Sequence, residues 1–199
     1  MSSPGEFASR CLTTDDVRRT LSTITYAVHQ ERDTLTFKRW LPTFLAFPLG
    51  GLIAIETVGS LTGPLSGAVA GLIAGAAIGT GQWLALRNDR RWIAATALAM
   101  SAGTALATAL THAGTDLADL ALTGLIAGAT VGAAQAVLLR SATWFAVTAG
   151  AWTLGWLATA SIGVDVERGY VVFGSAGAIT VTLLTGLALR RLPVYVVSR

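Results

Sequence analysis

His112, Asp116 and Asp119, in the segment THAGTDLAD, carry side chains that can bind a metal ion. They are separated by four and three positions, so on one continuous helix they would share a face. An imidazole and two carboxylates suit a divalent cation. The three residues are more simply interpreted as straddling a turn, and no fourth ligand is evident. We therefore expect no metal site, and these residues are only weak candidates.

Glu56 is the only acidic residue inside a long apolar stretch. An ionisable group within a membrane segment is a functional candidate, because its charge is costly in lipid. Glu56 follows Trp40 by sixteen residues, about 24 Å along a helix. In a hydrocarbon core about 30 Å thick this lies near the outer interface, where ionisation costs less. Glu56 is therefore a candidate contact for a solute, weakened by its depth.

Three uncharged polar side chains occupy matching positions. Gln82, Gln135 and Thr185 each stand five residues before an arginine, about 7–8 Å along a helix. Two interpretations stay open. The side chains form interhelical hydrogen bonds near the membrane interface, or they form a polar ring around a central axis, at the inner mouth of a solute pathway.

The elements that must carry these residues are long apolar runs. The chain has 199 residues, of which 53% are hydrophobic and 13% charged, and its mean hydropathy is +0.61. Soluble domains carry about 25% charged residues, and about 18 apolar residues suffice to cross a membrane. We therefore predict an all-α, polytopic membrane protein with six transmembrane helices. The runs are 41–58, 64–86, 92–110, 120–139, 144–162 and 171–189.

The basic residues predict how the chain is inserted. All lysines and arginines except Arg168 lie before the first run, between the second and third, between the fourth and fifth, or after the sixth. Short loops rich in Lys and Arg stay in the cytoplasm. Both termini are therefore expected to be cytoplasmic. The net charge of +3 follows from this rule and requires no nucleic-acid partner.

The sequence repeats itself three times. Trp40, Trp92 and Trp144 recur at intervals of 52 residues, each at the start of an odd-numbered run. GLIAGAAIGTGQWLALR begins at Gly71 and GLIAGATVGAAQAVLLR at Gly124; the third copy, GSAGAITVTLLTGLALR, has diverged most. Each unit reads as a helical hairpin inserted in the same sense, which suits a pseudo-threefold axis along the membrane normal. The expected divisions are a cytoplasmic segment 1–39, a transmembrane domain 40–191 with repeats 40–87, 92–140 and 144–190, and a tail 192–199.

Glycines recur every four residues along the second helix of the first two hairpins. Helices in lipid associate through small residues that allow close approach, so packing is the favoured interpretation. A lining for a pathway, or a surface on which helices slide, is the alternative. The glycines are Gly63, Gly67, Gly71, Gly75, Gly79, Gly124, Gly128 and Gly132.

Two local features complete the expected architecture. Thr14, followed by two aspartates, predicts the start of a helix, on which Val17, Leu21, Ile24 and Val28 share one face. This amphipathic helix is expected to lie on the inner leaflet, or else to dock on a partner or on the protein's own cytoplasmic face. Pro48, Gly50 and Gly51 in FPLGG predict a packing kink within the first run, or else a broken helix that coordinates a substrate. The tryptophans at run ends, Trp40, Trp83, Trp92 and Trp144, fit an interfacial aromatic belt.

The string GLIAGAAIGTGQWLALR, followed by NDRRW and a new apolar run, resembles a group of uncharacterised bacterial multi-pass membrane proteins. Those proteins carry repeated G-x-x-x-G-x-x-Q-W-L-x-L-R hairpins. The resemblance extends from about Trp40 to Arg191 and is strongest in the first repeat. It implies an array of hairpins in a bacterial cytoplasmic (inner) membrane and brings no activity with it.

The sequence holds no pattern typical of catalysis. No phosphate-binding loop, H-E-x-x-H, G-x-S-x-G or CxxC is present, so we expect no enzyme and no cofactor. The expected partners are the lipid bilayer and a membrane protein or a second copy of the chain. The polar set of Glu56, Gln82, Gln135 and Thr185 favours transport or binding of a small solute or a lipid. The scarcity of charge within the runs favours the alternative, a non-catalytic accessory or assembly subunit of a larger membrane complex.

Overall fold

The structure, a computed structural model, describes residues 14–87, 89–162 and 174–191; within the first helix, the side chains of Asp16 and of residues 24–35 are outside the description. The chain forms two compact units, Met1–Leu35 and Thr36–Arg199, and each is described by itself. The described residues form helices and short turns and contain no strand.

In the first unit the described residues belong to helix α1 (Thr14–Trp40), which ends where the first apolar run begins. Thr14 is the first residue that the structure describes, and it is already helical, so the predicted helix start stays a prediction. Val17 and Leu21, which begin the predicted apolar face, are exposed. The side chains of Ile24 and Val28 lie outside the described residues. The docking of this face on a membrane therefore stays a prediction.

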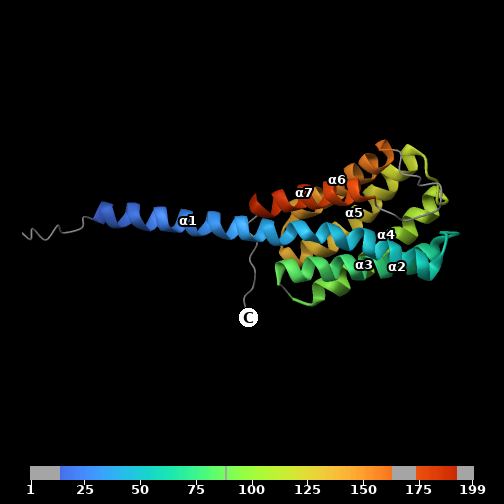
Figure 1. The fold of residues 1–199 in the computed structure, drawn as a ribbon, viewed down its shortest axis with the longest axis horizontal. Coiled ribbons are helices and arrows are strands. Elements are labelled where there is room, and N and C mark those ends of the chain that lie inside the picture. The colour runs from blue at the N-terminus through green and yellow to red at the C-terminus, as the bar shows by residue number, and fades with distance from the viewer. Residues whose placement is uncertain (1–13, 88, 163–173, 192–199) are drawn as a thin grey trace, which may run out of the picture. The chain divides into compact units, whose positions relative to one another are not determined.

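The second unit is a bundle of helices that follow one another around its interior. Successive helices pack side by side, and the last helix returns to the first two elements of the bundle (Figure 1). The elements after α1 are the 3-10 helix η1 (Leu41–Leu45), α2 (Ala46–Val58), α3 (Pro64–Leu86), α4 (Arg91–Thr111), α5 (Leu117–Leu139), α6 (Ala142–Ser161) and α7 (Ser175–Arg191).

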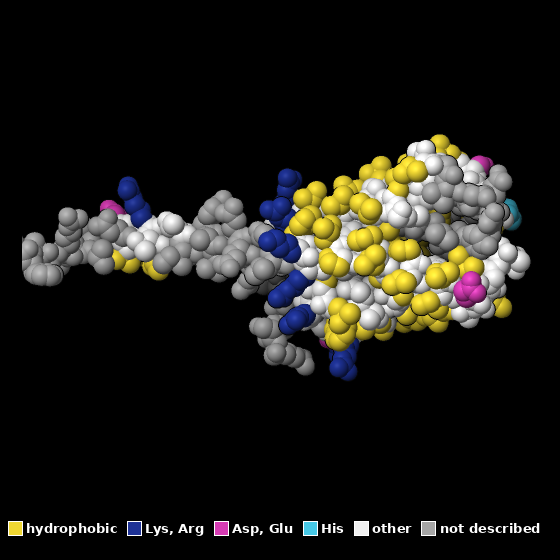
Figure 2. Space-filling model, in the orientation of Figure 1, with side chains coloured by type: hydrophobic (Ala, Val, Ile, Leu, Met, Phe, Trp, Pro, Cys, Tyr) yellow, Lys and Arg dark blue, Asp and Glu magenta, His cyan; other side chains and the backbone are white. Residues whose placement is uncertain are grey.

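Four helical segments among the described residues are long and apolar enough to cross a membrane. They are Thr36–Val58, Pro64–Leu86, Arg91–Thr111 and Leu117–Leu139. Apolar side chains are spread over the face of the bundle that Figure 2 shows. Leu65, Leu98 and Val137 are among the exposed apolar residues of the bundle. Aliphatic side chains that find no partner inside the protein suit contact with lipid tails. The all-helical membrane character predicted from composition agrees with these features.

The irregular backbone of the first run lies before Pro48 rather than at it. Leu41–Leu45 form the 3-10 turn, and Pro48 stands in the first turn of α2. There its missing N–H is one of those that have no partner within a helix. A Cβ added at Gly50 would lie 2.9 Å from the Cβ of Ala77 on α3. The first run thus departs from α-helical geometry in the turn just before Pro48, where a proline disturbs a helix, and α2 packs closely on α3 at Gly50.

The glycine rows lie against the next helix along the chain. A Cβ added at Gly71 would lie 2.6 Å from the carbonyl oxygen of Met100, and one at Gly128 would lie 2.6 Å from the Cβ of Trp152. Real Cβ atoms do not approach so closely, so α3 and α5 reach their neighbours only because these side chains are absent. Contacts of this kind join Gly67, Gly71, Gly75 and Gly79 to α4, and Gly124, Gly128 and Gly132 to α6.

Gly63 is the exception among the predicted packing glycines. It precedes α3 as its N-cap, and a Cβ there would meet nothing within 4 Å. Its backbone N–H donates a hydrogen bond to the Ser66 hydroxyl oxygen at 3.1 Å. Close packing therefore does not account for this glycine, which belongs to the turn before the helix.

The glycine contacts can be tested with one substitution at two sites. Gly71→Ala should lower the free energy of unfolding by about 1–3 kcal/mol, because the new methyl group overpacks a tight contact. Gly150→Ala is the matched control: Gly150 is exposed within α6, and a Cβ there meets open space. It should be neutral or stabilising by up to about 1 kcal/mol. Unfolding in mixed micelles measures both, and equal effects would contradict the packing role.

Candidate functional site

The three repeating tryptophans are buried inside the bundle. Trp40, Trp92 and Trp144 are 1%, 0% and 0% exposed. They therefore do not form the interfacial belt expected from the sequence. Trp83, in contrast, is half-buried, with the Arg90 guanidinium 5.8 Å from its ring centroid. The difference has a consequence for hydrogen bonding. A buried indole N–H needs an acceptor within the protein, whereas an indole at an interface can bond to water.

The indole N–H of each of these three tryptophans donates a hydrogen bond to a polar side chain near the end of another helix. The acceptors are the three residues that the sequence places five positions before an arginine. The bonds join Trp92 Nε1 to Gln82 Oε1 at 3.1 Å, Trp144 Nε1 to Gln135 Oε1 at 2.9 Å, and Trp40 Nε1 to Thr185 Oγ1 at 3.1 Å. The polar residues and the repeated tryptophans thus form one structural feature.

The two glutamines also bond to each other. Gln135 Nε2 donates to Gln82 Oε1 at 2.8 Å and to Thr96 Oγ1 at 3.0 Å. Both protons of this amide are then used, and Gln82 Oε1 accepts two bonds, which fills both of its lone pairs. Both side chains are buried. Amides bonded in this way hold α3, α4 and α5 together.

Trp40 connects Thr185, the third acceptor, to this set. Its ring meets that of Trp144 edge to face, with the centroids 6.0 Å apart and the planes at 80°. Thr185 accepts from Trp40 while its own hydroxyl donates to the Val181 carbonyl at 2.6 Å. Gly186 leaves room for the indole, because a Cβ there would lie 2.8 Å from Trp40 Cδ1. We call the connected side chains the indole–amide network: Trp40, Trp92, Trp144, Gln82, Gln135, Thr96 and Thr185.

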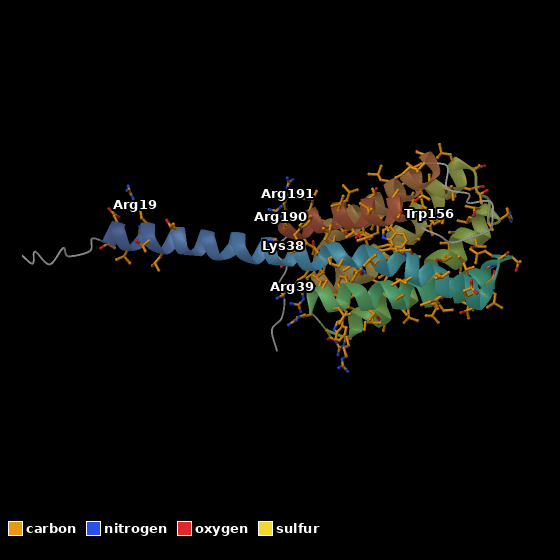
Figure 3. The ribbon with its side chains drawn as sticks, viewed as in Figure 1. Arg19, Lys38, Arg39, Trp156, Arg190 and Arg191 are labelled. Atoms are coloured by element: carbon orange, nitrogen blue, oxygen red, sulfur yellow. The ribbon has the colours of Figure 1, made fainter. Side chains whose placement is uncertain are left out.

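A small cavity lies in the interior of the bundle. Its volume is about 10 Å³, and its walls come from α2, α3, α4 and α6, including Phe47, Met100 and Trp156. Figure 3 shows the Trp156 ring within the bundle. A space of this size holds at most about one water molecule, and its walls are mainly aromatic and aliphatic. It offers no room for a solute.

The remaining candidates do not join the network. Glu56 is exposed near the end of α2, and His112 is exposed at the end of α4. Asp116 caps α5, where its carboxylate accepts from the Asp119 backbone N–H at 2.8 Å. In the part of the chain that the structure describes, no three His, Cys, Asp or Glu side chains are grouped to hold a metal ion.

Charge is divided between the two ends of the bundle. The exposed lysine and arginine side chains gather at one end, which we call the basic end, and the acidic side chains and His112 lie mainly toward the other (Figure 2). The network adjoins the basic end, since Trp40 follows Arg39 and Trp92 follows Arg91. The basic end carries Lys38, Arg39, Arg87, Arg90, Arg91, Arg140, Arg190 and Arg191.

Comparison with protein-family models, with curated proteins and with solved structures returned no match. The functional interpretation therefore depends on the geometry of this chain. Sequence reasoning singled out Gln82, Gln135 and Thr185, but it missed their tryptophan donors. The signal was present, because donors and acceptors recur with nearly the same period.

The contribution of the network can be measured with one substitution at two positions of α7. Thr185→Val keeps the side-chain volume but removes the acceptor of Trp40 Nε1. It should lower the free energy of unfolding by about 1 kcal/mol, as interhelical hydrogen bonds in membranes do. Thr180→Val is the control, because Thr180 donates to the Ala176 carbonyl of its own helix, and little change is expected. A loss at both positions alike would argue against the network.

Proposed function

We propose that this chain is a six-span membrane protein of three tandem hairpins around a pseudo-threefold axis. We further propose that it serves as a non-catalytic accessory or assembly subunit of a larger membrane complex. In this proposal α6 and α7 are the fifth and sixth spans. The basic end faces the cytoplasm of a bacterial inner membrane, since loops rich in Lys and Arg stay on that side.

The order of the hydrogen bonds supports the threefold arrangement. Trp92 of the second repeat bonds to Gln82 of the first, and Trp144 of the third bonds to Gln135 of the second. Trp40 of the first repeat then bonds to Thr185 of the third. Each tryptophan thus contacts the preceding repeat in cyclic order. Units arranged in a closed ring have this pattern, whereas units in a row would leave Trp40 without such a partner.

Packing in the interior supports the same arrangement. Ile78, Val131 and Val181 each stand nine residues before the arginine that ends their repeat, and each is at most 3% exposed. Phe47 of the first repeat meets Trp152 of the third, with ring centroids 5.6 Å apart. Equivalent positions are therefore buried equally, and side chains from the first and last repeats meet in the interior.

The observation that carries the functional proposal is that the conspicuous polar side chains bond to one another. A binding site presents a few polar groups to an open space. Here the Gln135 amide group and the Gln82 carbonyl oxygen are used up by indoles, by each other and by a threonine. They fasten helices together. A rigid bundle with an apolar outer surface suits a role in which another membrane protein binds to the surface of this one.

The proposed insertion can be tested by cysteine labelling. Cys11 is the only cysteine, so a Cys11→Ser background accepts single reporters. Thr115→Cys, between α4 and α5, should react with a membrane-impermeant maleimide in intact cells. Asp89→Cys, between α3 and α4, should react only after the membrane is opened. Both positions are exposed. The reverse pattern would overturn the orientation, and labelling of both from outside would overturn the hairpin topology.

The accessory role predicts a partner in fixed proportion. The tagged full chain, expressed at its native level and extracted directly into lipid nanodiscs, should carry one other membrane protein in a constant molar ratio, as measured by native mass spectrometry. Mixing isotope-labelled and unlabelled membranes after extraction is the control, because a pre-existing partner does not exchange. Recovery of the chain alone, or with proteins that exchange freely, would argue against the proposal.

A further inference from the structure

Four cations from the first and last residues of the second unit's sequence lie at the basic end of the bundle. Lys38 and Arg39 lie at the end of α1, Arg190 and Arg191 lie at the end of α7, and all four are exposed. Figure 3 shows their labelled side chains around adjoining helix ends. We call them the four-cation cluster. The ends of α1 and α7, far apart in the sequence, thus present their cations at the same end of the bundle.

The indole–amide network joins the two helix ends that carry these cations. The Trp40–Thr185 hydrogen bond joins residues 145 positions apart, directly below the cations. A Cβ added at Gly186 would lie 2.8 Å from Trp40 and 3.0 Å from Phe37, so α7 fits closely against both rings. The Arg190 guanidinium lies 5.7 Å from the Phe37 ring centroid. Arg190 is therefore placed by a specific contact, and the ends of α1 and α7 that carry the other three cations are held close together.

The charge rule for membrane insertion explains why cations lie on this side, but it does not require them to converge. The turn between α3 and α4 gives a comparison, because Arg91 there lies 3.6 Å from the Asp89 carboxylate. Among the residues that the structure describes, the four-cation cluster has no such ion pair. All four cations are exposed, and they carry the charge that an anion would meet at this end of the bundle.

The depth of the cluster indicates which anion it meets. The first segment able to cross a membrane begins at Thr36, so Lys38 and Arg39 stand in its first turn. Leu41 and Leu187, just beyond the cations, are exposed apolar side chains. Phosphate groups of lipids lie at this boundary, and arginine binds phosphate with two parallel hydrogen bonds.

We propose that the four-cation cluster binds the phosphate headgroup of an anionic membrane phospholipid, with the acyl chains along the apolar surface beside η1 and α7. This site goes beyond the accessory role and stands whether or not a protein partner exists. The source of the anion is the membrane rather than free phosphate, because the cluster sits directly above exposed aliphatic side chains.

The test titrates the purified full-length protein in detergent with a short-chain phosphatidylglycerol and, in parallel, a short-chain phosphatidylcholine. Bound lipid is counted by native mass spectrometry. The anionic lipid should bind at least about tenfold more tightly. Arg190→Gln with Arg191→Gln should weaken its binding about tenfold. Arg90→Gln with Arg91→Gln removes the same charge from another exposed arginine pair and should weaken it less than about threefold. Equal losses in the two double variants would overturn the proposal.

Two further measurements test whether the site needs both segments and whether it binds lipid rather than free phosphate. Lys38→Gln with Arg39→Gln should match the loss caused by the Arg190 and Arg191 pair, and an unchanged affinity would show that the two segments do not form one site. Inorganic phosphate, added in excess, should displace little of the bound lipid. Complete displacement would mean that the cluster takes a free anion, and the lipid assignment would then be wrong.

Discussion

The indole N–H groups of Trp40, Trp92 and Trp144 lie buried among apolar helices and find their acceptors within the protein, and these three hydrogen bonds organise the bundle. Water cannot reach the donors of Trp40, Trp92 and Trp144, which are almost fully buried. An unpaired donor there would cost about 1–3 kcal/mol. Each of these bonds therefore fixes the start of an apolar run to the end of another helix, and the three bonds together specify which helices are neighbours.

Glycine packing and hydrogen bonding act on the same interfaces. The glycine rows of α3 and α5 contact α4 and α6, which in the proposed architecture are the boundaries between successive repeats. The third boundary is built differently. Ala178 and Thr182 stand where the first repeat has Gly75 and Gly79, so α7 cannot approach in the same way. There α7 approaches closely at Gly186, where an added Cβ would meet the rings of Trp40 and Phe37.

The sequence predicts the helices better than the site. Long apolar runs and the tryptophan period indicate where helices begin and end, because lipid demands continuous apolar helices. The position of Gln82 and Gln135 near one end follows from their spacing to arginines. Their hydrogen-bond partners cannot be predicted in this way, because water at a membrane interface can bond to an amide and to an indole alike. Only the packing shows that Trp92 is turned inward while Trp83 is not.

The separations in sequence imply an order of events during synthesis. Trp92 and Trp144 find their acceptors 10 and 9 positions away, whereas Trp40 waits for a residue 145 positions later. The first tryptophan to leave the ribosome is thus the last to be satisfied. Until α7 is in place, the Trp40 indole N–H lacks its acceptor, and a product that stops before Thr185 would leave this donor unpaired.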